Sequence, residues 1–482
     1  MASTHLPSPE LACHFARYTR NRDFLEGEYA VKRKGRVYLG QASASMTPSE
    51  YQSYLESTVF WPAASRTMDG LVGLLFRKRP VFEASDVMQL MSETITVDGR
   101  SLTDLAEWAA REAMAKNWGG LLVDHPPVVE GLTAANAVEE GFRPFVAPYA
   151  AEAILEATHG VVRNRRVLVR VRLADSEHVT RELLLLNGQY VVRIHDESGD
   201  TPRVTQSIPF RDGQPLKEIP FVLLSTTASL SPGKAMLDDV ISLNHSHYRH
   251  EGKLTQAFLY LSAPVPWVTG VKPQTDAITG VVTPPALDVA PGAIWYFPDT
   301  EAKVGYLEFT GAGVGSLERQ RDHLEGQLAR VGARVIASEK NAAEAAETHA
   351  IRRTAENATL SVVSLNISRK IEAAMQLVSD WIDAGPVKFA LNTDFLPVPL
   401  TAQEITALVS AWTAGAMSDE SLFYNMREGE LFSHTLTFEE EEARKAASKE
   451  KAQPVVVAAP LVGETGPEAF MPGSEEAPTP EA

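Results

Sequence analysis

Three closely spaced histidines are the residues of this sequence whose types most resemble those of a metal-binding site. His245, His247 and His250 could each supply an imidazole nitrogen, which is a common zinc ligand. Their separations of two, three and five residues, however, do not place all three on one face of a helix. We therefore interpret them as surface or subunit-contact histidines and predict no metal site.

Two other pairs of residues have side chains suited to nucleophilic or acid–base chemistry, but lack the arrangement that it needs. Cys13 precedes His14, and Asp124 precedes His125. Adjacent positions in a sequence do not by themselves give the hydrogen-bonded geometry of a nucleophile with its base. We predict no catalytic residue. An enzyme, for instance a hydrolase with Asp124 in the 100–230 region, is the competing hypothesis.

Glycine-containing stretches offer no phosphate cradle. The Gly-Lys pairs at 233–234 and 252–253 lack both the earlier glycine and the following Ser or Thr of a Walker A loop. The three glycines within 311–315 precede a predicted helix, but their spacing is wrong for a dinucleotide loop and no βαβ unit surrounds them. We predict no nucleotide-driven motor and no cofactor-binding residue, and we interpret 311–315 as a joint between elements.

Composition is that of an ordinary folded protein with room for two to four domains. The chain has 482 residues, 44% of them hydrophobic and 22% charged, and a formal net charge of −17. That negative charge argues against a sequence-reading nucleic-acid binder, which needs clustered Lys and Arg. One cysteine excludes an intrachain disulfide, and no apolar run approaches the length of about 18 residues that spans a bilayer.

The region from 231 to 396 has the most informative order of elements. Residues 234–261 are apolar at both ends and polar in the middle, which predicts a helix of about 28 residues that crosses a wet space. A Pro- and Gly-rich stretch with short β-type runs follows, and then a second helix. Residues 337–347 carry no large apolar side chain and predict a loop, although they could instead continue the flanking helices. From Thr348 a regular apolar stripe predicts a long helix.

The flanking regions combine helices and strands, so the fold class is α+β. A capping box at 47–50 opens a helix that we expect to run towards Phe76, and another at 101–104 opens a helix that ends near Asn117. Between 160 and 223 we expect an antiparallel sheet with a hairpin turn at 187–188. Capping signals at 401, 418 and 437 predict short helices, and the Pro-rich 451–482 predicts a flexible tail.

This order resembles the portal proteins of tailed bacteriophages, and the phrases at 71–80, 118–126 and 243–249 resemble those of a subgroup of portal-like phage proteins. The resemblance covers residues 50–450. It implies a portal fold with a helical/β wing, a two-helix stem, a small β-containing clip, a long wing helix and an α-helical crown. The implied parts are 1–230 wing, 231–262 first stem helix, 263–315 clip, 316–336 second stem helix, 337–347 tunnel loop, 348–396 long wing helix and connection, 397–450 crown, and 451–482 flexible tail.

The resemblance also implies a function. A homo-oligomeric ring of twelve subunits would sit at one capsid vertex of the virion, after assembly in the host cytoplasm, and would catalyse nothing. It would admit and release double-stranded DNA and dock the terminase, the head-tail adaptor proteins and the major capsid protein, without contact to a membrane. A smaller-class head-tail connector is the nearer alternative, but adaptors in general look much shorter than this chain.

Two sets of residues carry roles on this interpretation. The tunnel-loop residues would approach DNA, and the charged residues of the second stem helix would form ion pairs between neighbouring subunits. The first set is Glu339, Lys340, Asn341 and Glu344, and the second is Arg319, Arg321, Asp322, Glu325 and Arg330. Because exposed ion pairs contribute only about 0–1 kcal/mol each, we expect packing to dominate assembly.

Overall fold

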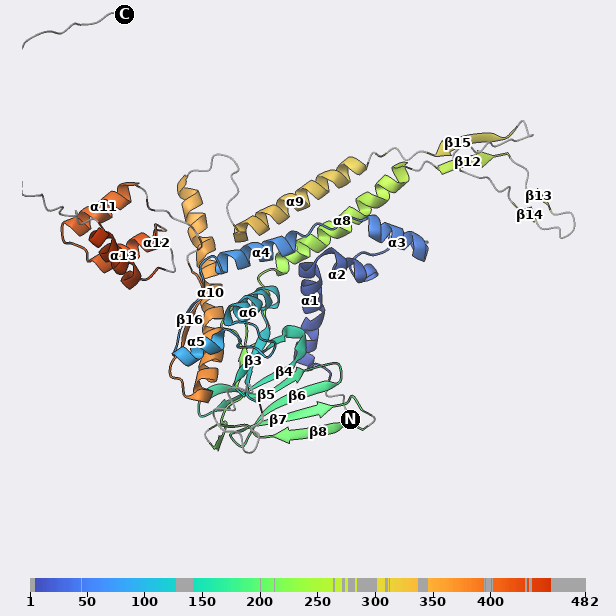
Figure 1. Ribbon diagram of the computed structural model, residues 1–482. Helices are drawn as coiled ribbons and strands as arrows, with labels where there is room; N and C mark the ends of the chain where they lie inside the picture. Colours follow the sequence, from blue (N-terminus) through green and yellow to red (C-terminus); the bar gives the residue numbers. More distant parts are fainter. Residues whose placement is uncertain are drawn as a thin grey trace, which may run out of the picture. The chain divides into compact units, whose positions relative to one another are not determined.

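The computed structural model contains two compact units, Met1–Phe395 and Leu396–Ala482. It describes residues 5–44, 46–126, 142–199, 201–211, 213–262, 265–270, 274–275, 282–283, 301–307, 311, 313–336, 346–393, 395, 400, 402–429, 431–432 and 436–451. Both helices and strands contribute to the first unit, so the predicted α+β class is confirmed (Figure 1). No helix in these ranges combines the length and the hydropathy that a bilayer span requires.

Six helices of the N-terminal region form much of the main hydrophobic core. The capping box at Thr47 and Glu50 opens α3, and the one at Ser101 and Asp104 opens α6, as predicted. The expected single helix from 47 to 76 is wrong, because two helices occupy this range. A proline at 62 prevents a continuous helix, since it lacks a backbone N–H and disfavours helical backbone in the residue before it. The helices are α1 (Pro9–Glu26), α2 (Glu28–Arg33), α3 (Pro48–Ser57), α4 (Ala63–Leu75), α5 (Asp86–Ser92) and α6 (Leu102–Lys116).

An antiparallel five-stranded sheet has the order β4-β5-β6-β7-β8. Its strands are β4 (Ile154–Val162), β5 (Arg165–Ala174), β6 (Val179–Leu186), β7 (Gln189–Asp196) and β8 (Arg203–Ser207). The predicted turn joins β6 to β7, and both Asn187 and Gly188 have positive φ, as a type I′ turn requires. The sheet therefore confirms the predicted hairpin.

The predicted sheet region is longer at its start and shorter at its end than expected. The first strand begins at Ile154, and β11 (Phe221–Leu223) belongs to a second sheet. There it pairs with β2 (Gly119–Asp124), which pairs in turn with β3 (Phe145–Ala150). Strand β2 is almost entirely buried, as the apolar run at 121–123 predicts. Two short strands, β9 (Phe210–Arg211) and β10 (Gln214–Pro215), form a separate ribbon.

Two long helices form an antiparallel hairpin. Helix α8 (Asp238–Ser262) and helix α9 (Val314–Ile336) lie side by side, and α4 packs against both of them (Figure 1). Their register follows from His247 beside Glu325, His250 beside Leu317 and Leu261 beside Gly311. Beyond their connected ends, β12 (Val265–Thr269) pairs with β15 (Lys303–Leu307) and β13 (Gln274–Thr275) with β14 (Val282–Thr283).

The third long helix, α10 (Ala346–Ile382), spans 37 residues. Its predicted stripe is confirmed, because Leu360, Ile367, Ile371 and Val378 are all buried. The helix packs against α6 and the three-stranded sheet, and β16 (Lys388–Ala390), which follows it, pairs with β1 (Val81–Glu83).

The second unit contains α11 (Ala402–Thr413), α12 (Asp419–Glu428) and α13 (Phe438–Lys451). Ser418 caps α12 and the Thr437–Glu440 capping box opens α13, as predicted. Phe423 is buried at its centre, against Phe432 and Phe438. Lys451, the first residue of the predicted tail 451–482, is the last residue of α13, and the rest of that tail lies outside the described residues.

Gly252 lets α8 pass closely over α3. A methyl group added there would collide with the Tyr54 hydroxyl and come within 2.8 Å of Leu39 Cδ1. We therefore expect Gly252→Ala to lower the free energy of unfolding by about 1–3 kcal/mol, the usual cost of overpacking, in urea titrations followed by circular dichroism.

Gly326→Ala in α9 is the matched control. Its added methyl group would have only the end of the Arg330 side chain nearby, at 3.9 Å. It should be neutral or stabilise the helix by up to about 1 kcal/mol. Equal losses for the two variants would show that close packing at Gly252 is not the cause.

Candidate functional site

The hairpin of α8 and α9 is the part of the structure that carries the predicted stem residues. The base of α8 is fixed by a buried carboxylate, Asp238. Its Oδ1 accepts a hydrogen bond from Asn21 Nδ2 at 2.7 Å, and its Oδ2 accepts one from the backbone N–H of Ala235 at 2.8 Å. Arg20 and Arg17 of α1 lie 3.4 and 3.7 Å away. A buried charge with this many partners holds the start of α8 against α1.

The middle of α8 supplies a second attachment through Asn244, which is fully buried. Its Oδ1 accepts a hydrogen bond from the backbone N–H of Ala64, and its Nδ2 donates one to the carbonyl oxygen of Trp61, both at 2.9 Å. Ala64 lies in the first turn of α4, where N–H groups have no partner within the helix, and Pro62 offers no capping side chain. Helix α8 therefore caps α4.

The polar middle of α8 has a buried face, which the expectation of a wet surrounding misses. Asn244, His247, Tyr248 and His250 are buried within the chain, whereas Ser246, Arg249 and Lys253 are exposed. Asn244 and His250 satisfy backbone groups of neighbouring elements, a role that composition alone does not distinguish from exposure to water.

The three histidines diverge, as their spacing indicates, but two of them are not at the surface. His245 Nε2 donates to the carbonyl oxygen of Tyr38 at 3.0 Å, and His250 Nε2 donates to that of Leu317 at 2.7 Å. His247 instead turns towards carboxylates, with Glu325 Oε1 3.4 Å from its Nε2. Burial lowers the pKa of His245, which favours its neutral form.

The far end of the hairpin exposes large apolar side chains. We call this set the distal apolar surface: Phe258, Leu259, Trp267, Val304 and Tyr306. Leu259 is the most exposed of them within α8, at 62%. Beside it, between α3 and the end of α8, lies an open hollow of about 800 Å³ whose lining includes Phe258, Leu259, Tyr54 and Met46. Apolar side chains gathered in this way are typical of a surface that binds another protein.

The predicted stem residues make short-range contacts within the chain. Arg319 donates to Ser316 Oγ at 3.0 Å, Arg330 to the carbonyl oxygen of Gly326 at 3.0 Å, and Arg321 to Asp322 at 2.9 Å. Neither Arg319 nor Arg330 has a carboxylate partner among the described residues. The Glu325 side chain faces α8 of its own chain. The tunnel-loop residues Glu339, Lys340, Asn341 and Glu344 lie outside the described residues.

Asp124 and His125 point to different partners. The Asp124 carboxylate accepts a hydrogen bond from its neighbour's backbone N–H at 2.9 Å and pairs with Arg181 at 3.0 Å. Burial raises the pKa of Asp124. The His125 ring stacks on Trp381, with 5.8 Å between ring centroids, and its Nδ1 lies 2.7 Å from the carbonyl oxygen of Pro126. The two side chains thus do not form a hydrogen-bonded acid–base pair.

Cys13 and His14 likewise do not form a dyad. The exposed Cys13 thiol donates to the carbonyl oxygen of Glu10 at 3.3 Å, whereas His14 Nδ1 lies 3.2 Å from an Arg17 nitrogen.

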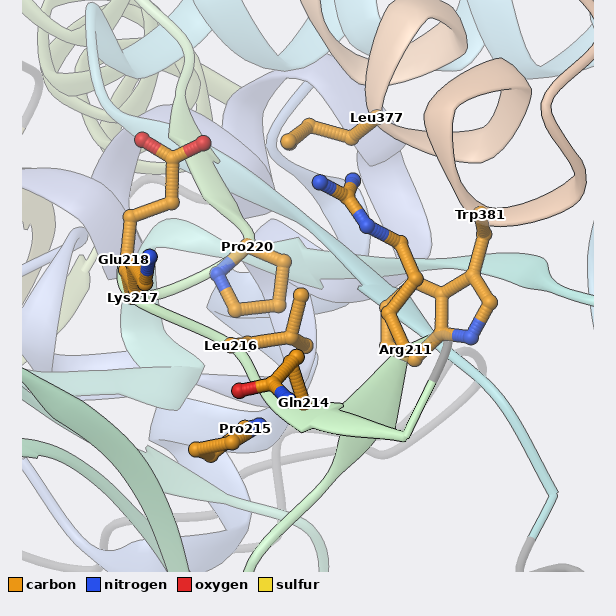
Figure 2. A pocket seen from close by; sticks show the side chains of 9 residues that line it. All are labelled: Arg211, Gln214, Pro215, Leu216, Lys217, Glu218, Pro220, Leu377 and Trp381. Carbon is orange, nitrogen blue, oxygen red and sulfur yellow. The ribbon is translucent and has the colours of Figure 1, made fainter.

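A hollow of about 470 Å³ lies where α10 meets the β9–β10 segment. Figure 2 shows Leu377 and Trp381 reaching from α10 towards Pro220 and Leu216, with the Arg211 side chain beside them. Its charged members are Arg211, Lys217 and Glu218, and it contains none of the predicted functional residues. It presents no nucleophile with a base, and we assign no chemistry to it.

The residues that sequence reasoning missed are the attachments of α8. Asp238 and Asp239 are adjacent and chemically identical, yet the first side chain is 8% exposed and the second 66%. Nothing in the sequence distinguishes them. The difference appears only once α1 places two arginines beside the first.

Asp238→Asn should show how much the base of α8 depends on this charge. The variant keeps the shape of the side chain but leaves Arg17 and Arg20 without their partner, so the free energy of unfolding should fall by about 3 kcal/mol. Asp239→Asn breaks only the exposed pair with Lys234 and should change it by less than about 0.5 kcal/mol. Urea titration of both variants makes the comparison, and similar values would contradict the anchoring role.

Comparison with known proteins gives a family match over part of the chain and likenesses to solved structures, two of which are described below. Residues 236–382, which run from the start of α8 to the end of α10, match the family described as "Domain of unknown function (DUF4055)". No curated protein matches. A chain titled "Neck of empty GTA particle computed with C6 symmetry" is 13% identical with a TM-score of 0.35, over 80% of this chain and 97% of that one.

A second chain, titled "Neck of native GTA particle computed with C12 symmetry", is 11% identical with a TM-score of 0.33, over 83% of this chain and 98% of that one. Scores and identities this low do not establish a shared function.

Proposed function

We propose that this chain is a phage portal protein, one subunit of a ring that forms the DNA channel at a capsid vertex. The observation that carries the proposal is the hairpin of α8 and α9, which is fixed at its base and middle and exposes the distal apolar surface at its far end. The order of hairpin, β ribbon and long helix is the order in which the resemblance places stem, clip and wing.

A neighbouring subunit is the occupant that best accounts for the distal apolar surface. Fully burying a large apolar side chain contributes roughly 1.5–3 kcal/mol, so several such side chains together favour association strongly. In a closed ring every subunit presents its hairpin to the next, and the same side chains are covered in all copies. Arg319 and Arg330 lie on the same hairpin and have no carboxylate partner within the described ranges, so on this proposal they pair with a neighbour's carboxylates.

The finer assignments of the portal proposal concern partners. The clip, 263–315, would meet the terminase and the head-tail adaptors, and the wing the major capsid protein. Residues 337–347 would reach the DNA. The net charge of −17 suits a conduit that does not grip its cargo. On this proposal the chain has no catalytic activity.

Assembly mass tests the proposal most simply. Light scattering on the purified protein should give a large, discrete multiple of the 52.6 kDa chain, twelve copies by the resemblance. Leu259→Lys should reduce the assembled fraction at least about tenfold, the effect of 1.4 kcal/mol per contact, because the new charge would have to be buried between subunits. Its circular dichroism spectrum should not change, since the side chain is exposed in the monomer and the fold does not depend on it.

Leu90→Lys is the matched control, because Leu90 is also an exposed leucine of a helix, at 75%, but lies in α5 away from the distal apolar surface. Assembly should be unaffected. A wild-type protein that stays monomeric at all concentrations and salt levels would refute the ring. A ring without bound terminase or capsid protein in pull-down experiments would favour the smaller connector class instead.

A further inference from the structure

Three side chains that can bind a metal converge inside the hairpin. His247 Nε2 lies 3.4 Å from Glu325 Oε1 and 3.7 Å from Glu251 Oε1, and one ligand atom of each residue lies within 4.8 Å of the others. We call these residues the hairpin cluster. Among the described residues, no other group of three His, Cys, Asp or Glu side chains meets in this way.

The fold brings the cluster together from two helices. His247 and Glu251 are four residues apart in α8, which places them on one face, one turn from each other. The antiparallel register of the hairpin then sets Glu325 of α9 opposite them. The His247 side chain is only 3% exposed and its ring packs edge to face against Trp61, so its Nε2 is held towards the carboxylates.

We propose that the hairpin cluster binds a divalent transition-metal ion of the zinc type and thereby clamps α8 to α9. Zinc binds imidazole nitrogen and carboxylate oxygen at about 2.0–2.1 Å, and two ligands at that distance and at the tetrahedral angle are about 3.4 Å apart. The observed separations from His247 Nε2 match this value closely. An imidazole ligand favours zinc over magnesium or calcium, which prefer oxygen ligands alone.

The placement of the His247 ring leaves one nitrogen for an ion. Its Nδ1 is buried and has no hydrogen-bond partner among the described residues. Its Nε2 faces both carboxylates, so Nε2 is the atom that would bind the ion.

Arg321 is the other cation near the cluster. Its Nε lies 3.8 Å from Glu325 Oε1, but its closer contact is with Asp322 Oδ1, 2.9 Å from its Nη2. The guanidinium thus balances part of the charge of Glu325 and interacts electrostatically with Glu251. Glu325 is 44% exposed, which gives an ion a route to the site.

Zinc titration of the chelator-stripped full-length protein, followed by calorimetry, tests the site. We expect one zinc per chain and a rise in the thermal midpoint when zinc is added, because an ion that binds only the folded state stabilises it. Glu251→Gln and Glu325→Gln should each weaken zinc binding at least about tenfold, since even indirect partners of a metal cost that much. Both substitutions keep the size of the side chain and leave the buried histidine in place.

Glu318→Gln is the matched control, because Glu318 lies in α9 with Glu325 but outside the hairpin cluster. This variant should bind zinc with the affinity of the unaltered protein. Cobalt should reproduce the stoichiometry and give the visible absorption of a low-coordinate site, lost in both cluster variants. If zinc binds equally to all the variants, it binds elsewhere and the proposal is wrong. If the unaltered protein binds no zinc, the proposal is also wrong, and the hairpin cluster is then only a group of ion-paired side chains. Both ligand helices belong to one chain, so the result does not depend on ring formation.

Discussion

The buried contacts that fix α8 are the constraint on which the hairpin depends. Asp238 ties the start of the helix to α1, and Asn244 ties its middle to the first turn of α4. A carboxylate with several donors is costly to separate from them in a buried setting, so the direction in which α8 leaves α1 and α4 is fixed. Helix α9 follows by packing along α8 and α4. The β12–β15 ribbon is connected to the far ends of these two helices, so its position depends on theirs.

A hairpin held in this way has two different halves. In the half nearest α1 and α4, Asp238 and Asn244 are paired within the chain, and Leu237, Val240 and Ile241 are buried. The far half exposes the distal apolar surface, including Phe258, Leu259 and Trp267. Such a division suits a subunit of an assembly, because an apolar surface that is exposed in the single chain can be buried against a neighbour. The proposed ring and the proposed metal clamp use different parts of the hairpin and can fail independently.

The sequence predicts the elements better than their surroundings. Periodicity and capping signals located both hairpin helices, the stripe of α10, the turn at Asn187 and Gly188, and the capping boxes of α3 and α6. These features are determined by residues that are close together in the sequence. The buried face of the polar middle of α8 cannot be predicted from neighbouring residues, because burial depends on which distant elements pack against it. Pro62, in contrast, is a local signal of the break between α3 and α4. Glu325 lies beside His247 of its own chain, and only the register of two helices far apart in sequence reveals this pairing. Its role at a subunit contact stays a prediction.

A three-dimensional map of the purified protein from single-particle electron microscopy tests the central claim most directly. The account predicts a closed ring with an axial hole, in which neighbouring α8–α9 hairpins contact one another through Phe258, Leu259 and the β12–β15 ribbon. A ring whose contacts lie elsewhere and leave these side chains in solvent would contradict the role assigned to the hairpin. Single chains alone, at every concentration examined, would contradict the channel itself.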